Sequence, residues 1–194
     1  MNYPGTDVAL VSAAISGDEA AIEALVAESL PHVVTWSVRL CGLAADGEDC
    51  AHEAMIVVLR KLPELREPEA FPYWLFGITR NVARNLRRKA WLKRWLPGIV
   101  PDQPDPTPSP ALRLVSSQRA RRVAEILDRL PEAQRVALIL CDLEGRPASE
   151  VARLLGMPAG TVKSRLRLGR ARFVKEAEAM DALDELSGAA EVVG

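Results

Sequence analysis

A proline-rich segment near the middle of the chain constrains its fold more than any other feature. Six of the 14 prolines fall within residues 97–110. Proline lacks the amide hydrogen and clashes with the preceding turn, so this segment cannot continue a helix and is predicted to be an extended linker. The linker at 96–113 divides the 194-residue chain into an N-terminal domain at 1–95, a C-terminal domain at 114–178 and an acidic tail at 179–194.

Helical patterns fill both predicted domains. The spacing of apolar and breaking residues predicts helices at 7–15, 18–42, 47–62 and 69–95, then at 115–130, 132–142, 147–155 and 159–177. Ser16 and Glu19 fit a capping box, and Asp46 is placed to cap the next helix. The predicted class is all-α: two small helical domains joined by the linker, the second containing a helix-turn-helix. The tail is predicted to be disordered, with a short regulatory helix around Asp181–Leu186 as the alternative.

Charge is strongly segregated along the chain. Residues 71–101 carry seven basic and no acidic residues, and 113–175 carry fourteen basic and six acidic ones. The other segments are acidic, with four basic and twelve acidic residues in 1–70 and six acids without a base in 176–194. Basic blocks attract polyphosphate backbones, whereas acidic segments repel DNA and suit a protein partner or solubility. The pattern indicates two nucleic-acid-binding surfaces.

Membrane insertion and secretion are not expected. The longest runs without a charged residue, such as 8–17, have ten residues, whereas a membrane-spanning helix needs about 20. A secretory signal begins with basic residues, but the first base here is Arg39. We therefore expect a cytoplasmic protein.

The inventory of reactive side chains is poor. Cys41, Cys50 and Cys141 are too scattered for a disulfide framework and are predicted to be reduced, mostly buried thiols. A metal or redox role for Cys50 with His52 is the alternative, which is disfavoured because residues two apart on a helix point in different directions. The pair His52-Glu53 lacks the second histidine of a zinc-binding His-Glu-x-x-His motif. We expect no enzymatic activity, metal, cofactor or small-molecule substrate.

The helix predicted at 69–95 has two faces. A helical wheel places an apolar stripe on one side, which is predicted to be core: Phe71, Leu75, Ile78, Val82 and Leu86. Trp74, Phe76 and Trp95 are predicted to be packing residues. Cations and aromatic rings that share the outer region can track phosphates and stack on unpaired bases. These candidates for contacting opened DNA are Tyr73, Arg80, Asn81, Arg84, Arg87, Arg88 and Trp91.

Residues 148–166 have the spacing of a helix-turn-helix. Ala152 allows close helix approach, Gly156 suits a positive φ in the turn, and Pro158 suits the start of the second helix. The predicted buried side consists of Val151, Leu155, Val162, Leu166 and Phe173. In such motifs early residues of the second helix meet base edges and later basic ones meet phosphates. The candidates are Thr161, Lys163, Ser164, Arg165, Arg167 and Arg170.

Two segments resemble extracytoplasmic function (ECF) sigma factors of bacterial RNA polymerase. Residues 46–54 and 71–89 resemble the second conserved region, and 130–145 with the run Gly-Thr-Val-Lys-Ser-Arg-Leu at 160–166 resemble the fourth. The resemblance implies that the first domain binds core polymerase and melts the minus-ten element, and that the second reads the minus-thirty-five element. It also implies an anti-sigma factor and a polymerase contact through helix 47–62, to which we assign Asp46, Glu48, Asp49 and Glu53.

Two other functions fit parts of the pattern. An autonomous helix-turn-helix regulator would bind duplex DNA by itself, but it has no need for a second, single-strand-binding surface at 71–91. A protein-binding module would use the acidic residues 1–70 as its main interface.

Overall fold

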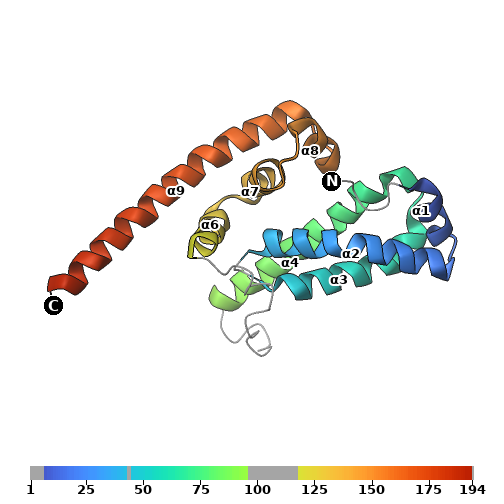
Figure 1. Cartoon of the computed structure of the whole chain (residues 1–194), viewed down its shortest axis with the longest axis horizontal. Coiled ribbons are helices and arrows are strands. Elements are labelled where there is room, and N and C mark those ends of the chain that lie inside the picture. The colour runs from blue at the N-terminus through green and yellow to red at the C-terminus, as the bar shows by residue number, and fades with distance from the viewer. Residues whose placement is uncertain (1–6, 43–44, 96–117, 194) are drawn as a thin grey trace. The chain divides into compact units, whose positions relative to one another are not determined.

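Helices account for the regular structure in both halves of the chain (Figure 1). The computed structural model describes residues 7–42, 45–95 and 118–193, and no strand occurs among them. The chain divides into two compact units, Met1–Ser117 and Gln118–Gly194. The predicted all-α class with two helical domains is confirmed. The predicted linker at 96–113 lies outside the described residues, so the predicted domain boundaries stay a prediction.

The first unit is a bundle in which α2, α3 and α4 lie side by side (Figure 1). Its helices are α1 (Val8–Ile15), α2 (Glu19–Cys41), α3 (Gly47–Lys61) and α4 (Phe71–Trp95). Two short 3-10 turns, Leu62–Glu64 and Pro68–Ala70, connect α3 to α4 and lie against α1. The predicted helices of this half are confirmed to within about two residues at each end.

Aspartates cap three of these helices. Asp7, Asp18 and Asp46 accept hydrogen bonds from backbone amides in the first turns of α1, α2 and α3. The predicted cap at Asp46 is confirmed, with its Oδ1 2.7 Å from the amide nitrogen of Glu48. The predicted capping box at Ser16 is wrong. Ser16 ends α1 and donates to the Ser12 carbonyl at 3.0 Å, because Asp18 stands closer to the start of α2 and takes the capping role.

Aromatic packing fills the core of the first unit. Trp36 of α2 and Phe76 of α4 are buried in a T-shaped contact with ring centroids 5.1 Å apart. The predicted apolar stripe of α4 is confirmed in part: Phe71, Leu75 and Val82 are buried, and Ile78 and Leu86 are half-buried. Phe76 is confirmed as a packing residue. Trp74 is half-buried against Phe71, and the surroundings of the Trp95 side chain lie outside the description.

The second unit packs three short helices against one long helix. The short helices are α6 (Gln118–Arg129), α7 (Glu132–Leu138) and α8 (Ala148–Leu155), and the long one is α9 (Ala159–Val193). A π turn, η3 (Ile139–Leu143), follows α7, and the amide of Glu144 donates to the carbonyl of Ile139 at 3.0 Å. The predicted end of the last helix at 177 is wrong: α9 continues to Val193 and takes in most of the segment predicted to be a disordered tail.

The helix-turn-helix consists of α8, the turn at Gly156 and the start of α9. Gly156 has φ 61° and ψ 40°, the left-handed conformation predicted for it. Pro147 and Pro158 precede α8 and α9, and their carbonyls accept hydrogen bonds from the amides of the third and fourth residues of each helix. Val151 and Val162 are buried as predicted. The assignment of Leu155 was one residue off, since Leu154 is the buried leucine, and Leu166 and Phe173 are half-buried. No helix in the described part of the chain is long and apolar enough to cross a membrane.

Candidate nucleic-acid interfaces

The outer face of α4 carries the first group of candidate DNA contacts. Asn81, Arg84 and Arg88 are exposed, and the indole of Trp91 is 59% exposed. Tyr73 and Arg80 are half-buried, and Arg80 Nε is buried without a hydrogen-bond partner in the described chain. This face therefore combines exposed cations with an exposed aromatic ring.

Arg87 has a structural contact in addition to its predicted role. Its Nη1 donates to the carbonyl oxygen of Cys41 at 2.6 Å, which joins the middle of α4 to the last residue of α2. A carbonyl at a helix end has no partner within its own helix, so the guanidinium satisfies it. The side chain is half-buried. A role for Arg87 in DNA binding stays a prediction, and any DNA contact has to be compatible with this anchor.

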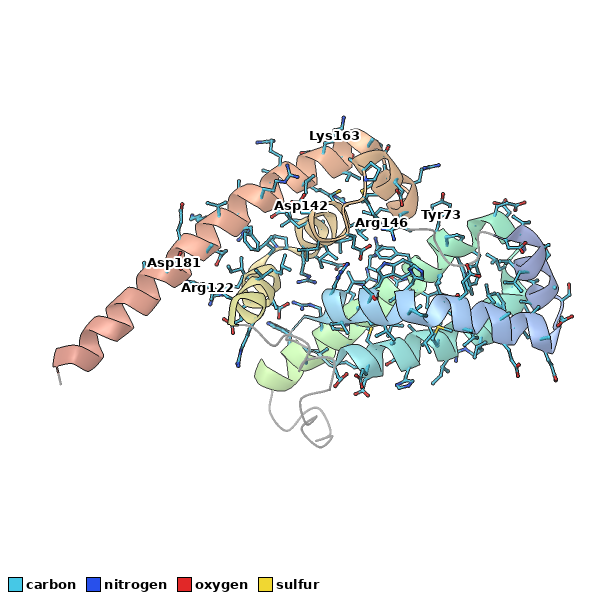
Figure 2. All side chains as sticks on the ribbon, viewed as in Figure 1. Tyr73, Arg122, Asp142, Arg146, Lys163 and Asp181 are labelled. Atoms are coloured by element: carbon cyan, nitrogen blue, oxygen red, sulfur yellow. The ribbon has the colours of Figure 1, made fainter. Side chains whose placement is uncertain are left out.

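The start of α9 carries the second group. Lys163, Ser164 and Arg167 are exposed, and Lys163 points away from the helix in Figure 2. Thr161 and Arg165 are half-buried, and Arg165 Nη1 lies 3.1 Å from the sulfur of Met157 in the turn. The contact holds the Arg165 guanidinium against the turn between α8 and α9.

Most other arginines in the second unit pair with acids. Arg121 pairs with Glu125 at 3.3 Å and Arg129 with Glu176 at 3.7 Å, and Arg122 pairs with Asp181 (Figure 2). No acidic oxygen lies within 4 Å of several cations in the described part of the unit, and these are Arg153, Lys163, Arg165, Arg167, Arg172 and Lys175. Five of the six lie on the first half of α9. That segment is the cationic surface left available for phosphates.

Sequence reasoning missed a buried ion cluster next to the helix-turn-helix. The side chain of Arg146 is 7% exposed and donates to Glu144 at 2.9 Å and to Glu150 at 2.6 Å. Its backbone amide donates to the Leu140 carbonyl at 3.0 Å. Arg146 therefore ties the π turn to the first turn of α8. The i,i+4 spacing of Arg146 and Glu150 is a signal that could have indicated this pair.

Acidic and apolar side chains share the predicted polymerase-binding helix α3. Asp49 and Glu53 are exposed and Glu48 is half-buried, whereas Asp46 is occupied as the helix cap. Ile56, 65% exposed, lies on the same helix, as does the exposed Leu59. Ile56 and Leu59 are three residues apart, so their exposed apolar side chains adjoin on one face of the helix. Assignment of these acids to polymerase contact stays a prediction.

The cysteines are free thiols. Cys41 and Cys50 are buried and Cys141 is half-buried, as predicted. A hydrogen bond between the first two thiols, which the sequence analysis missed, raises the pKa of Cys41 and lowers the pKa of Cys50. His52 and Glu53 are exposed, and within the described ranges no group of three or more His, Cys, Asp or Glu side chains could hold a metal ion.

Comparison with known proteins connects both surfaces to one family. The family model for sigma-70 region 2 matches residues 25–93, which span α2 to α4, and that for sigma-70 region 4 matches residues 120–173, which span α6 to α9. The ECF RNA polymerase sigma factor RpoE of Cereibacter sphaeroides is 31% identical over 158 residues, 80% of this chain and 86% of RpoE. The chain spans 62% and 34% of the lengths of two other curated relatives.

Two solved structures share the fold. CnrH, in complex with the cytosolic domain of CnrY, has a TM-score of 0.63 at 24% identity over 90% of this chain and 98% of that one. The sigma factor RpoE in complex with the anti-sigma factor NepR from Bartonella quintana has a TM-score of 0.54 at 22% identity, covering 78% and 92%. Given the two matching regions and the similarity to RpoE over most of its length, this chain belongs to the ECF sigma factors of RNA polymerase.

Proposed function

We propose that the chain is a transcription initiation factor that binds core RNA polymerase and contacts two promoter elements, one through each unit. The observation that carries the proposal is the position of its available cations. In the described part of the second unit, five of the six cations without an acidic partner lie within residues 163–175 of α9. The outer face of α4 supplies a separate set in the first unit.

The α4 face suits opened DNA. Arg84 and Arg88 can follow phosphates, and the exposed ring of Trp91 offers a stacking surface that unpaired bases can use. Stacking of a base on an aromatic ring contributes about 1–3 kcal/mol and tolerates any sequence. A protein that recognises only duplex DNA gains nothing from this combination. The α4 face therefore supports a role at the minus-ten element, where the strands separate.

The α9 face suits duplex DNA at the upstream element. Lys163 and Arg165 lie in the first two turns of the second helix of the motif, from which side chains reach base edges in the major groove. Arg167, Arg172 and Lys175 follow along the helix, in the position of phosphate contacts. The Met157 contact limits the conformations of Arg165 before DNA is bound, which lowers the entropy lost on binding.

Protein partners have a separate surface on α3. The exposed Asp49, Glu53 and Ile56 are not suited to DNA but suit core polymerase or an anti-sigma factor that competes with it. The solved complex of the sigma factor RpoE with the anti-sigma factor NepR supports the expectation of an anti-sigma partner. The chain would then act in the cytoplasm beside the polymerase, which supplies the catalysis.

Run-off transcription with purified core RNA polymerase tests this proposal. We expect the full chain to direct transcripts from fixed start sites on genomic DNA fragments from its own bacterium, and core alone to give none. Binding of the chain to duplex fragments without transcripts in the presence of core would favour the autonomous regulator. Binding to protein partners without either result would favour the protein-binding module.

A further inference from the structure

Arg170 differs from the cations around it because it already forms an ion pair with an acidic side chain. Its Nε donates to Asp142 Oδ2 at 2.9 Å and its Nη2 donates to Asp142 Oδ1 at 2.6 Å. Two parallel hydrogen bonds between a guanidinium and a carboxylate form the strongest common ion-pair geometry. These bonds also raise the pKa of Arg170. The Arg170 side chain is 60% exposed, so the pair lies at the surface, where DNA could reach it.

Two backbone features bring the partners together. The π turn at Ile139–Leu143 widens the end of α7 and carries Asp142. On α9, the neighbouring Gly169 lies so close to α7 that an added Cβ would be 3.2 Å from the Gln134 carbonyl oxygen. The pair therefore forms where α9 is packed against α7, so the backbones that carry the two side chains are held close together.

Arg170 lies in line with two of the available cations of α9 but is not available itself. Lys163, Arg167 and Arg170 are separated by four and three residues, so they lie along one side of the helix. No acid lies within 4 Å of Lys163 or Arg167 in the described chain, whereas Arg170 is neutralised. A phosphate that approached Arg170 would have to displace Asp142, and Asp142 would also repel that phosphate.

We propose that Asp142 is a specificity-determining residue, which holds Arg170 away from DNA phosphates and so limits sequence-independent binding by the second unit. Phosphate contacts add affinity on every sequence and carry no sequence information. Removing one such contact therefore weakens non-specific binding, while contacts to base edges are unchanged. The inference rests on the proposed function, since it assumes that this side of α9 approaches DNA.

Salt-dependent binding of the full-length chain to a random-sequence duplex tests the inference. Each phosphate contact changes the slope of log K against log salt by about 0.9 on duplex DNA. We expect Asp142→Asn to steepen the slope by about that amount, so that the variant loses about threefold more of its affinity than the wild type between 50 and 200 mM salt. Arg170→Ala should keep the wild-type slope. The double variant should match Arg170→Ala, because there is no arginine to release.

Controls separate release of Arg170 from simple loss of a negative charge. Glu132→Gln removes one acid from α7 without contacting Arg170 and should keep the wild-type slope. Far-UV circular dichroism melts verify that each variant is folded. The inference would be overturned if Asp142→Asn steepened the slope equally in the wild type and in the Arg170→Ala variant, because loss of repulsion alone would explain that result. A slope reduced by Arg170→Ala alone would also overturn it, since Arg170 would then already contact phosphate.

Failure of this inference is distinguishable from failure of the proposed function. Promoter-dependent run-off transcription by the wild-type chain decides the proposed function, and it does not depend on Asp142. A chain that supports transcription but shows an unchanged slope in Asp142→Asn contradicts only the role of Asp142.

Discussion

A Cβ atom on Gly47 would lie 2.6 Å from the Cα of Val38 and 2.8 Å from its Cγ2. Gly47 is the first residue of α3, and Val38 lies one turn before the end of α2. Side-chain carbon atoms essentially never come this close to backbone atoms, so the approach of the two helices requires glycine at this position. The contact positions α3, the helix that carries the proposed polymerase-binding surface.

Gly47→Ala should destabilise the first unit by about 1–3 kcal/mol, the usual cost of overpacking a close contact. All four tryptophans lie within 36–95, so tryptophan fluorescence during urea unfolding follows this unit. Gly77→Ala is the matched control: it lies in α4, and its added Cβ would meet nothing within 4 Å. The control should be neutral or slightly stabilising, because alanine favours helices by about 0.5–1 kcal/mol over glycine. Equal stability of the two variants would contradict the packing account.

Substitutions of Arg87 and Arg84 should distinguish a structural role from a DNA-binding role on α4. Arg87→Ala removes the hydrogen bond to the Cys41 carbonyl and should lower the unfolding free energy of the first unit by about 1–3 kcal/mol. Arg84 is exposed, so Arg84→Ala should change the unfolding free energy by less than about 0.5 kcal/mol. It should also reduce the salt dependence of promoter opening. Urea unfolding and opening kinetics measure the two effects. A stable Arg87→Ala variant would show that the anchor contributes little.

Arg146→Met should strongly destabilise the second unit. The substitution leaves the side chains of Glu144 and Glu150 without their shared cation, and loss of one partner of a buried ion pair costs about 3–5 kcal/mol. Arg153→Met on the exposed face of α8 is the control and should be within about 0.5 kcal/mol of the wild type. This unit has no tryptophan, so an unfolding transition that far-UV circular dichroism detects and tryptophan fluorescence does not belongs to this unit. Similar melting of both variants would contradict a stabilising role for the cluster.

The Cys41–Cys50 thiol pair should make the first unit sensitive to alkaline pH. The hydrogen bond with Cys50, and then burial, raise the pKa of Cys41 in the folded state. A raised pKa contributes stability that is complete below the unfolded value of about 8.5 and is lost as the pH rises above it. The lowered pKa of Cys50, due first to the same hydrogen bond, offsets part of this loss.

Cys41→Ser should therefore flatten the decline of unfolding free energy between about pH 8.5 and 10. The measurement is urea unfolding followed by tryptophan fluorescence across this range. Cys141→Ser, in the other unit, should keep the wild-type profile for the first unit. Identical profiles for all three proteins would show that the thiol pair does not control the alkaline limit.

The helices could be predicted from sequence because caps, turn residues and apolar spacing act within a few residues of themselves. Asp46 and Gly156 act within a few residues of themselves, so their cap and left-handed turn could be predicted from spacing. The Ser16 cap was wrong because α1 extends to Ile15 and Ser16 ends it, whereas Asp18 directly precedes α2 and accepts a hydrogen bond from the Ala21 amide. The continuation of α9 beyond residue 177 was missed, and here Glu176 and Asp181 pair with arginines of α6, which are distant in the sequence.

Contacts between distant segments could not be predicted from pattern. A helical wheel places Arg87 among other exposed cations, and only the folded chain brings it to the end of α2, 46 residues away. Asp142 and Arg170 are 28 residues apart and meet because of a π turn that has no recognised sequence signal. The general position of both cationic surfaces followed from charge segregation, but which cations remain available depends on tertiary ion pairs.

Permanganate footprinting tests the central claim, that α4 and the start of α9 contact different promoter elements. Core polymerase would be combined with the wild-type chain, an Arg84→Ala/Arg88→Ala variant or a Lys163→Ala/Arg165→Ala variant. Each complex is measured on a promoter that the wild-type chain transcribes: permanganate reactivity reports opening of the duplex form, and run-off transcripts report initiation on the form with the minus-ten segment already unpaired. The α4 variant should fail to open the duplex promoter but should initiate on the unpaired template. The α9 variant should give the same result with and without the upstream element on both templates. Equal loss of the same step by both variants would contradict the claim.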